Sequence, residues 1–149
     1  MGYLETLDYD LTIKVKDLPH FEKIKNEFLK DFDTMERKEL VRTYFGDEVL
    51  KKYLDPNDRE YKLVDWIPDR IKQIKIGSRY GEEYEVIIKD AEELQKWYDS
   101  DLFVIFLATC RINGRLIFTG AESVEYYIIK ENIPYGIHVD DSILKRLPL

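Results

Sequence analysis

The stretch LFVIFLATCRINGRLIFTG, Leu102–Gly120, decides how the fold is interpreted. Its first six residues, Leu102–Leu107, are all apolar, which is typical of a central strand covered on both faces. Asn113-Gly114 is the preferred pair for a two-residue type I′ turn, because both positions of that turn need a positive φ. The stretch therefore predicts a β-hairpin that turns at Asn113-Gly114.

The predicted hairpin divides the polar residues of this stretch between two faces. Cys110 would lie opposite Ile117 and on the same face as Arg115, whereas Arg111 would lie on the other face. The two arginines would then be unable to form a single anion clamp. Because its cross-strand neighbour is apolar, Cys110 is expected to be buried and structural. Only Arg115, if it leaned back over the sheet, would favour a reactive thiol.

The chain before this stretch is expected to form a strand and then helices. DYDLTIKVKD (8–17) alternates apolar and polar residues with the period of a half-buried strand. Asp17 is expected to cap a helix that tolerates Pro19 in its first turn. Asp33 and Glu36 form a capping-box pair for a second helix, which is expected to end at Gly46. The apolar face of the first helix would consist of Phe21, Ile24, Phe28 and Phe32.

The rest of the chain is expected to be mainly strand. A strand over 70–76 would return through GSRYGE to EYEVIIKD (83–90), and a short helix would follow over 91–99. VEYYIIKE (124–131) alternates again, and YGIHV (135–139) would add an edge strand. The prediction is a single α+β domain over 1–149, with an N-terminal strand and helices followed by a mainly antiparallel sheet and an Asn-Gly hairpin.

Composition restricts the classes of function. The 149 residues carry a formal net charge of -7, which argues against nucleic-acid binding and favours cationic partners. A charged fraction of 36% is above the usual ~25%. Asn and Gln are scarce while Lys, Glu, Ile and Tyr are plentiful, which favours a thermophilic source, although AT-rich coding would produce the same balance.

Location follows from the cysteine count and from the apolar runs. Cys110 is the single cysteine, so no intramolecular disulfide can form, and a reducing compartment is expected. MGYLETLDYD (1–10) lacks the basic and apolar parts of a signal peptide. No apolar run approaches the ~20 residues that span a bilayer. We therefore expect a cytoplasmic protein with no membrane partner.

The usual chemical motifs are not found. The 7 glycines include no phosphate-binding spacing, and G-x-S-x-G does not occur. His138, Asp140 and Asp141 have a spacing that can ligate a metal. The same residues also fit a strand end followed by a helix cap, and the sequence leaves this open. No catalytic residue, cofactor or metal is predicted.

Tyrosine is the one positive indication of function, with 11 in the chain. Tyrosine is enriched at recognition surfaces because it joins a large apolar ring to a polar tip. The candidates for partner binding are Tyr126, Tyr127 and Tyr135. Strand alternation does not allow both Tyr126 and Tyr127 to face solvent. Filling of the core is the alternative role for each of these rings.

Three functions stay open. The leading hypothesis is a small, acidic, soluble protein that acts by protein–protein binding, as an inhibitor, immunity or accessory protein. The first alternative is an enzyme or small-ligand binder whose pocket is assembled from dispersed residues. The second is a viral or host-defence inhibitor that mimics nucleic-acid charge. A deep pocket lined by titratable groups would favour the enzyme, and a tyrosine-rich patch rimmed with acids would favour the protein binder.

Overall fold

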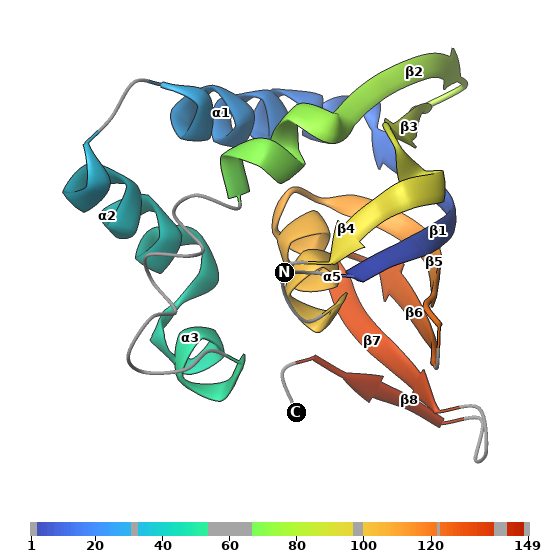
Figure 1. Cartoon of the computed structure of the whole chain (residues 1–149). Coiled ribbons are helices and arrows are strands. Elements are labelled where there is room, and N and C mark those ends of the chain that lie inside the picture. The colour runs from blue at the N-terminus through green and yellow to red at the C-terminus, as the bar shows by residue number, and fades with distance from the viewer. Residues whose placement is uncertain are drawn as a thin grey trace.

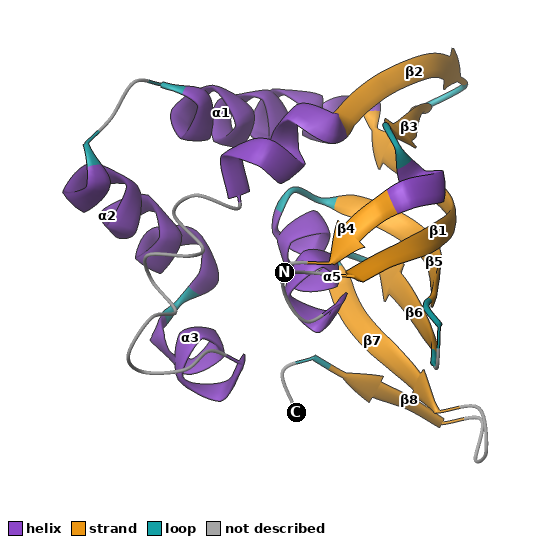
Figure 2. Ribbon diagram, viewed as in Figure 1, coloured by secondary structure: helices purple, strands orange, loops and turns teal. Residues whose placement is uncertain are grey.

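The α-helices gather on one side of an antiparallel sheet, and none of the described helices covers its other side, the open face. The structure, a computed structural model, describes residues 3–30, 33–53, 67–96, 100–121, 123–138 and 143–147. Figures 1 and 2 show the α-helices on the left and the strands on the right, with α5 between the other helices and the sheet. The α+β class is as predicted, and the open face of the sheet becomes the surface of interest.

Strand β1 (Tyr3–Lys14) lies in the middle of the sheet. On one side it pairs with β3, which pairs with β2, and on the other with β5, which β6, β7 and β8 follow in order. The short strand β4 also pairs with β1, and every pairing is antiparallel. The bounds are β2 Ile74–Tyr80, β3 Glu83–Ile88, β4 Leu94–Lys96, β5 Ile112–Thr119, β6 Val124–Lys130, β7 Ile133–His138 and β8 Ile143–Arg146.

The helices near the N-terminus follow most local signals in the sequence, but the Asp17 side chain makes no capping hydrogen bond at the start of the first helix and pairs with Arg111 instead. After the 3₁₀ turn η1 (Val15–Asp17), α1 (Leu18–Leu29) buries Phe21, Ile24 and Phe28, as predicted, whereas Phe32 lies outside the described residues. The α2 helix (Thr34–Phe45) begins where Asp33 accepts a hydrogen bond from the Glu36 amide at 2.9 Å. Gly46 ends it with a φ of 82°, and α3 (Asp47–Tyr53) follows.

The prediction of a central strand at Leu102–Leu107 is wrong. These residues belong to the helix α5 (Ser100–Thr109), in which every residue from Leu102 to Ala108 is buried. An uninterrupted apolar run is compatible with a buried strand and with a helix enclosed on all sides, so periodicity does not distinguish them. α5 lies against β5, β6 and β7 on one side and against α2 on another, which covers its whole circumference.

The prediction of a hairpin at Asn113-Gly114 is also wrong. Both residues lie inside β5, where Asn113 pairs with Thr12 and Gly114 with Leu11. Gly114 is required there for close packing, because a Cβ on it would lie 1.9 Å from the Asp10 carbonyl oxygen. Gly114 does have a positive φ, of 136°, but no chain reversal occurs at it.

A two-residue turn of the predicted kind joins β6 to β7. Glu131 and Asn132 have φ values of 51° and 65° between the paired residues Lys130 and Ile133, as type I′ requires. Asn113 holds this turn, since its Oδ1 accepts from the Asn132 amide at 2.8 Å and its Nδ2 donates to Asn132 Oδ1 at 2.9 Å. Asn113 was predicted to form a turn itself, but it stabilises the turn between β6 and β7.

Two further boundaries differ from the prediction. Residues 67–73 are helical, so the strand expected over 70–76 begins only at Ile74. A helix is expected over 91–99, but residues 91–96 form a 3₁₀ turn, η2 (Ala91–Glu93), followed by β4, and residues 97–99 lie outside the described residues. Asp90 and Glu93 have the spacing of a capping pair, which is why the sequence predicts a helix here. Pairing of β4 with β1 in the sheet overrides that local signal.

The described residues form one hydrophobic core between the helices and the sheet. Phe106 of α5 stacks on Phe45 at 6.1 Å between ring centroids and meets Phe28 edge-on at 6.4 Å. Cys110 is fully buried at the end of α5, as predicted, although it lies in a turn and not opposite Ile117 in a hairpin. This core covers only the inner face of the sheet.

Candidate functional site

The adjacent tyrosines of β6 face opposite ways, as strand alternation predicts. Tyr127 points into the core with 4% of its surface exposed, and Tyr126 is half-buried on the open face. The Tyr127 hydroxyl lies 2.6 Å from Asp101 and 2.9 Å from Glu125. Burial, together with these two carboxylates, raises the pKa of Tyr127 above its ordinary value. Tyr127 is therefore a structural residue.

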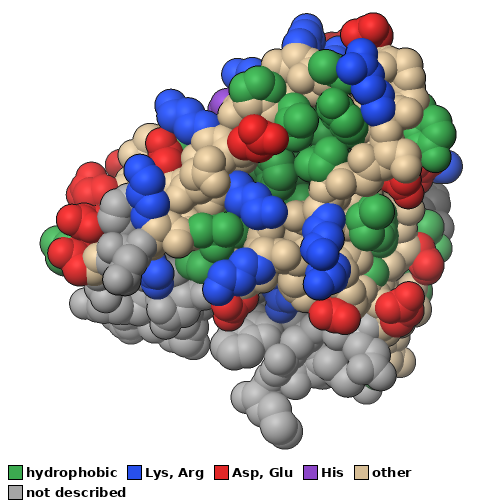
Figure 3. Space-filling model, turned by 90° about the horizontal axis from the view of Figure 1, so that it is seen from above, with side chains coloured by type: hydrophobic (Ala, Val, Ile, Leu, Met, Phe, Trp, Pro, Cys, Tyr) green, Lys and Arg blue, Asp and Glu red, His purple; other side chains and the backbone are tan. Residues whose placement is uncertain are grey.

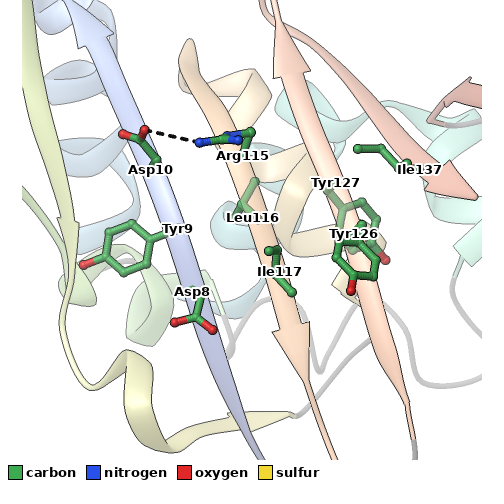
Figure 4. A pocket seen from close by; sticks show the side chains of 9 residues that line it. All are labelled: Asp8, Tyr9, Asp10, Arg115, Leu116, Ile117, Tyr126, Tyr127 and Ile137. Atoms are coloured by element: carbon green, nitrogen blue, oxygen red, sulfur yellow. Dashed lines mark ion pairs between the residues drawn. The ribbon is translucent and has the colours of Figure 1, made fainter. Parts of the chain in front are cut away.

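Strand register assembles one row of side chains across the open face. Asp8 on β1 pairs with Ile117 on β5, Ile117 with Tyr126 on β6, and Tyr126 with Ile137 on β7. Directly paired residues share a face and touch. Figure 4 shows Asp8, Ile117 and Tyr126 side by side from three different strands. The row is acidic at β1 and apolar from β5 to β7.

A second row runs parallel to the first. Asp10 pairs with Arg115, Arg115 with Ile128, and Ile128 with Tyr135. Arg115 Nη2 lies 3.9 Å from Asp10 Oδ2, and both side chains are more than 70% exposed, at 72% and 77%. Such an exposed pair contributes little to stability. Of the three candidate tyrosines, Tyr126 and Tyr135 thus share the open face, and Tyr127 does not.

The first row lines a hollow of about 480 Å³, together with Asp10 and Arg115 of the second row. Its volume lies in the range of about 300–1,000 Å³ that is usual for small-molecule sites. Charged side chains of β1 and β5 line one side of the hollow, and apolar and aromatic side chains of β6 and β7 line the other (Figure 4). The lining residues are Asp8, Tyr9, Asp10, Arg115, Leu116, Ile117, Tyr126, Tyr127 and Ile137.

A second, more acidic hollow of about 260 Å³ adjoins the first at Asp10. Glu83 and Glu85 of β3 line it, together with Tyr80, which is 70% exposed. Glu83 lies opposite Lys14 in the sheet, and Glu85 lies opposite the uncharged Thr12. The open face is therefore acidic over β1 and β3 and apolar over β6 and β7.

The end of the molecule formed by α1 and β2 is different in charge. Figure 3 shows Lys and Arg side chains spread over this end, around an area of hydrophobic side chains. Hydrogen bonding to Lys89 and its positive charge lower the pKa of Lys75, and Lys25 contributes to the same shift. Asp and Glu side chains lie among the basic ones in the same view, so this end of the molecule carries both signs of charge.

Of the remaining candidates, Cys110 and Arg111 lie within the described residues. Burial raises the pKa of the Cys110 thiol, which keeps the thiol protonated. Arg111 forms an ion pair with Asp17 at 3.3 Å, whereas Arg115 forms one with Asp10. Asp140, Asp141 and the side chain of His138 lie outside the described residues. In the described part of the chain, no three His, Cys, Asp or Glu residues are arranged to hold a metal ion.

No family model, curated protein or solved structure matches this chain. Among the described residues, every helix is too short or too polar to cross a membrane. The fold and the surface themselves define the class: an α+β protein whose antiparallel sheet keeps one face open, with aromatic and acidic side chains on that face.

Most residues of this surface could not be predicted from the sequence. Asp8, Ile117, Ile128 and Ile137 become neighbours only through pairing of strands that are distant in the chain. One local signal was present in YYII (126–129). In a strand, Tyr126 and Ile128 lie on one face, and Tyr127 and Ile129 lie on the other, so both faces are apolar. Such a strand is expected to be covered on both sides.

Proposed function

We propose that this protein acts by binding another protein through the open face of its sheet, as an inhibitor, immunity or accessory protein. The observation that carries the proposal is the composition of β6. Its inner residues Tyr127 and Ile129 are buried in the core, and its outer residues Tyr126 and Ile128 are also apolar. An antiparallel sheet that faces water normally has polar residues on that side.

The neighbouring strands support the proposal. Ile117, Tyr135 and Ile137 extend the apolar area on both sides of β6. Contiguous apolar patches of this kind mark interaction sites on proteins. The carboxylates of β1 and β3 border the patch, so the surface has an apolar centre with a charged rim, as protein interfaces do. The acidic rim favours a partner with basic residues.

Photo-crosslinking in cells of the source organism tests the proposal. A photoreactive amino acid would replace Tyr126, Tyr135 or, as the control, Met35, which is 65% exposed on α2. We expect one defined protein adduct from positions 126 and 135 and a different, diffuse pattern from position 35. An identical pattern from all three positions would contradict the proposal.

The captured protein then allows affinities to be measured. Tyr126→Ala should weaken its binding by about tenfold or more, as for an aromatic residue at the centre of an interface. The melting temperature should change little, because Tyr126 lies outside the core. Tyr127→Ala should instead lower the melting temperature strongly. Equal binding by the Tyr126 variant and the natural protein would exclude this face.

The volume of the first hollow favours a second candidate function, small-ligand binding or catalysis. Asp8, Asp10 and Arg115 would supply the polar contacts to such a ligand. A thermal-shift screen of metabolites tests it, and a ligand that stabilises the natural protein but not an Ile137→Asp variant would favour this candidate. Mimicry of nucleic acid has less support, because Lys14 and Arg115 interrupt the carboxylates on this face.

A further inference from the structure

Asp8 and Asp10 project from the same face of β1 into the same hollow, but their neighbours differ. Asp10 lies opposite Arg115, with which it forms an ion pair. Asp8 lies opposite Ile117, an apolar residue. Within the part of the chain that the structure describes, Asp8 has no ion-pair partner. The hollow therefore contains one compensated and one uncompensated carboxylate.

The uncompensated carboxylate begins the row that continues through Ile117 to Tyr126. Neighbouring strands are about 4.8 Å apart, so these three side chains present a carboxylate, an aliphatic surface and an aromatic ring in sequence. A lysine or arginine side chain has the complementary pattern, because its aliphatic stem packs on apolar surface while its charged end seeks an anion. Arginine can in addition stack on an aromatic ring.

We propose that the hollow receives one basic side chain of the partner protein, with the Asp8 carboxylate as its counter-ion and with Ile117 and Tyr126 against its stem. This inference rests on the proposed protein-binding function and specifies the chemistry of the partner. The partner carries an arginine or lysine flanked by apolar residues, which pack on the apolar part of the same face at Ile128 and Ile137.

A charged peptide and its neutral analogue provide the test. The probes are acetyl-Leu-Arg-Leu-amide and the same peptide with citrulline, which keeps the shape of arginine and lacks its charge. Each is titrated into the isotope-labelled full chain, and binding is followed by NMR. We expect the arginine peptide to shift the amide signals of Asp8, Ile117 and Tyr126, and the citrulline peptide to bind more weakly.

Two variants with the same change of charge separate contact from long-range attraction. Asp8→Asn should weaken binding of the arginine peptide by about threefold to tenfold, the size of one typical hydrogen bond at an exposed site. Glu85→Gln, in the second hollow of the same face, should weaken it by less than about twofold. Both variants should keep the natural melting temperature, because both side chains are exposed.

Three outcomes would overturn the inference. These are equal binding of the two peptides, the absence of any shift at the three residues, and equal effects of the two variants. The proposed function can survive this failure. If crosslinking at position 126 captures a partner that the Asp8→Asn variant binds with unchanged affinity, the open face is the interface, but Asp8 is not its counter-ion for a basic side chain.

Discussion

At Gly114 of β5, the backbone of β1 leaves no room for a side chain. The φ of Gly114 is 136°, and a Cβ there would lie 1.9 Å from the Asp10 carbonyl oxygen. Gly114→Ala should therefore lower the free energy of unfolding by about 3 kcal/mol or more, since both strain and overlap must be relieved. Urea denaturation measures this loss.

Gly136→Ala is the matched control for this prediction. Gly136 also lies in a strand of the sheet, but its added Cβ would meet only the Leu147 side chain, at 3.9 Å. We expect a change in unfolding free energy within about 1 kcal/mol. Similar losses in the two variants would show that general strand propensity, and not the contact with β1, explains the glycine at position 114.

Tyr127 makes stability depend on alkaline pH. The unfolded chain begins to ionise this phenol near its ordinary pKa of 10.0, whereas burial and the Asp101 and Glu125 carboxylates raise the pKa in the folded state. The unfolded state therefore gains relative stability as the pH rises above the unfolded pKa. The contribution of Tyr127 is fully present below about pH 9 and declines above about pH 10.

Tyr127→Phe tests this link. Near pH 8 the variant should be less stable by about 1–3 kcal/mol, because the two carboxylates lose a hydrogen-bond donor. Between about pH 9 and pH 11 it should lose less stability than the natural protein. Tyr44, whose pKa is raised to about 12, and Cys110 are present in both proteins, so the difference between the two urea curves reports Tyr127. If both proteins lost the same stability over this pH range, the pKa of Tyr127 in the folded state would not be raised.

Among the elements, α5 is enclosed between the other helices and the sheet, and its residues Leu102 to Ala108 are all buried. Phe106 is its central contact with the helical layer, through Phe28 and Phe45. Phe106→Ala should cost about 3–5 kcal/mol of unfolding free energy, which is usual for a fully buried ring. Leu29→Ala on the exposed side of α1 should cost much less. Equal costs would mean that α5 is not enclosed in this way.

The elements also show where local signals are sufficient. The Asp33–Glu36 pair correctly predicts the start of α2, and Gly46 its end, because capping depends on residues within one turn. The signal is insufficient at Leu102–Leu107, where both a strand and a helix can be fully buried. It is also insufficient at Leu94–Lys96, where the partner strand β1 decides the conformation.

At the scale of the whole molecule, the distribution of charge should govern association with the partner. The acidic rim of the open face consists of carboxylates of β1 and β3, among them Asp10, Glu83 and Glu85. The association rate with the captured partner should fall as salt is raised towards ~0.15 M, where the screening length is about 8 Å. Stopped-flow mixing over a salt series measures this rate.

Two variants test which part of the open face controls the association rate and which controls the dissociation rate. Replacing Glu83 and Glu85 together with glutamine should reduce both the association rate at low salt and its salt dependence. Tyr126→Ala should instead increase the dissociation rate and leave the salt dependence unchanged, because its contribution is apolar contact. An association rate that does not respond to salt would contradict steering by the acidic rim.

The sequence by itself determined the features that depend on neighbours within one turn or one strand. These are the caps of α2, the buried faces of α1 and β1 and the opposite orientation of Tyr126 and Tyr127. The α+β class and the burial of Cys110 were also predicted correctly, but the burial was inferred from a cross-strand neighbour that the structure does not contain. Only the tertiary structure decided that Leu102–Leu107 is a helix, that Asn113-Gly114 lies within a strand, and that Asp8, Ile117 and Tyr126 form one row. The physical reason is that enclosure and strand register are set by contacts between segments far apart in the chain, and a local pattern carries no record of which distant segment will supply them.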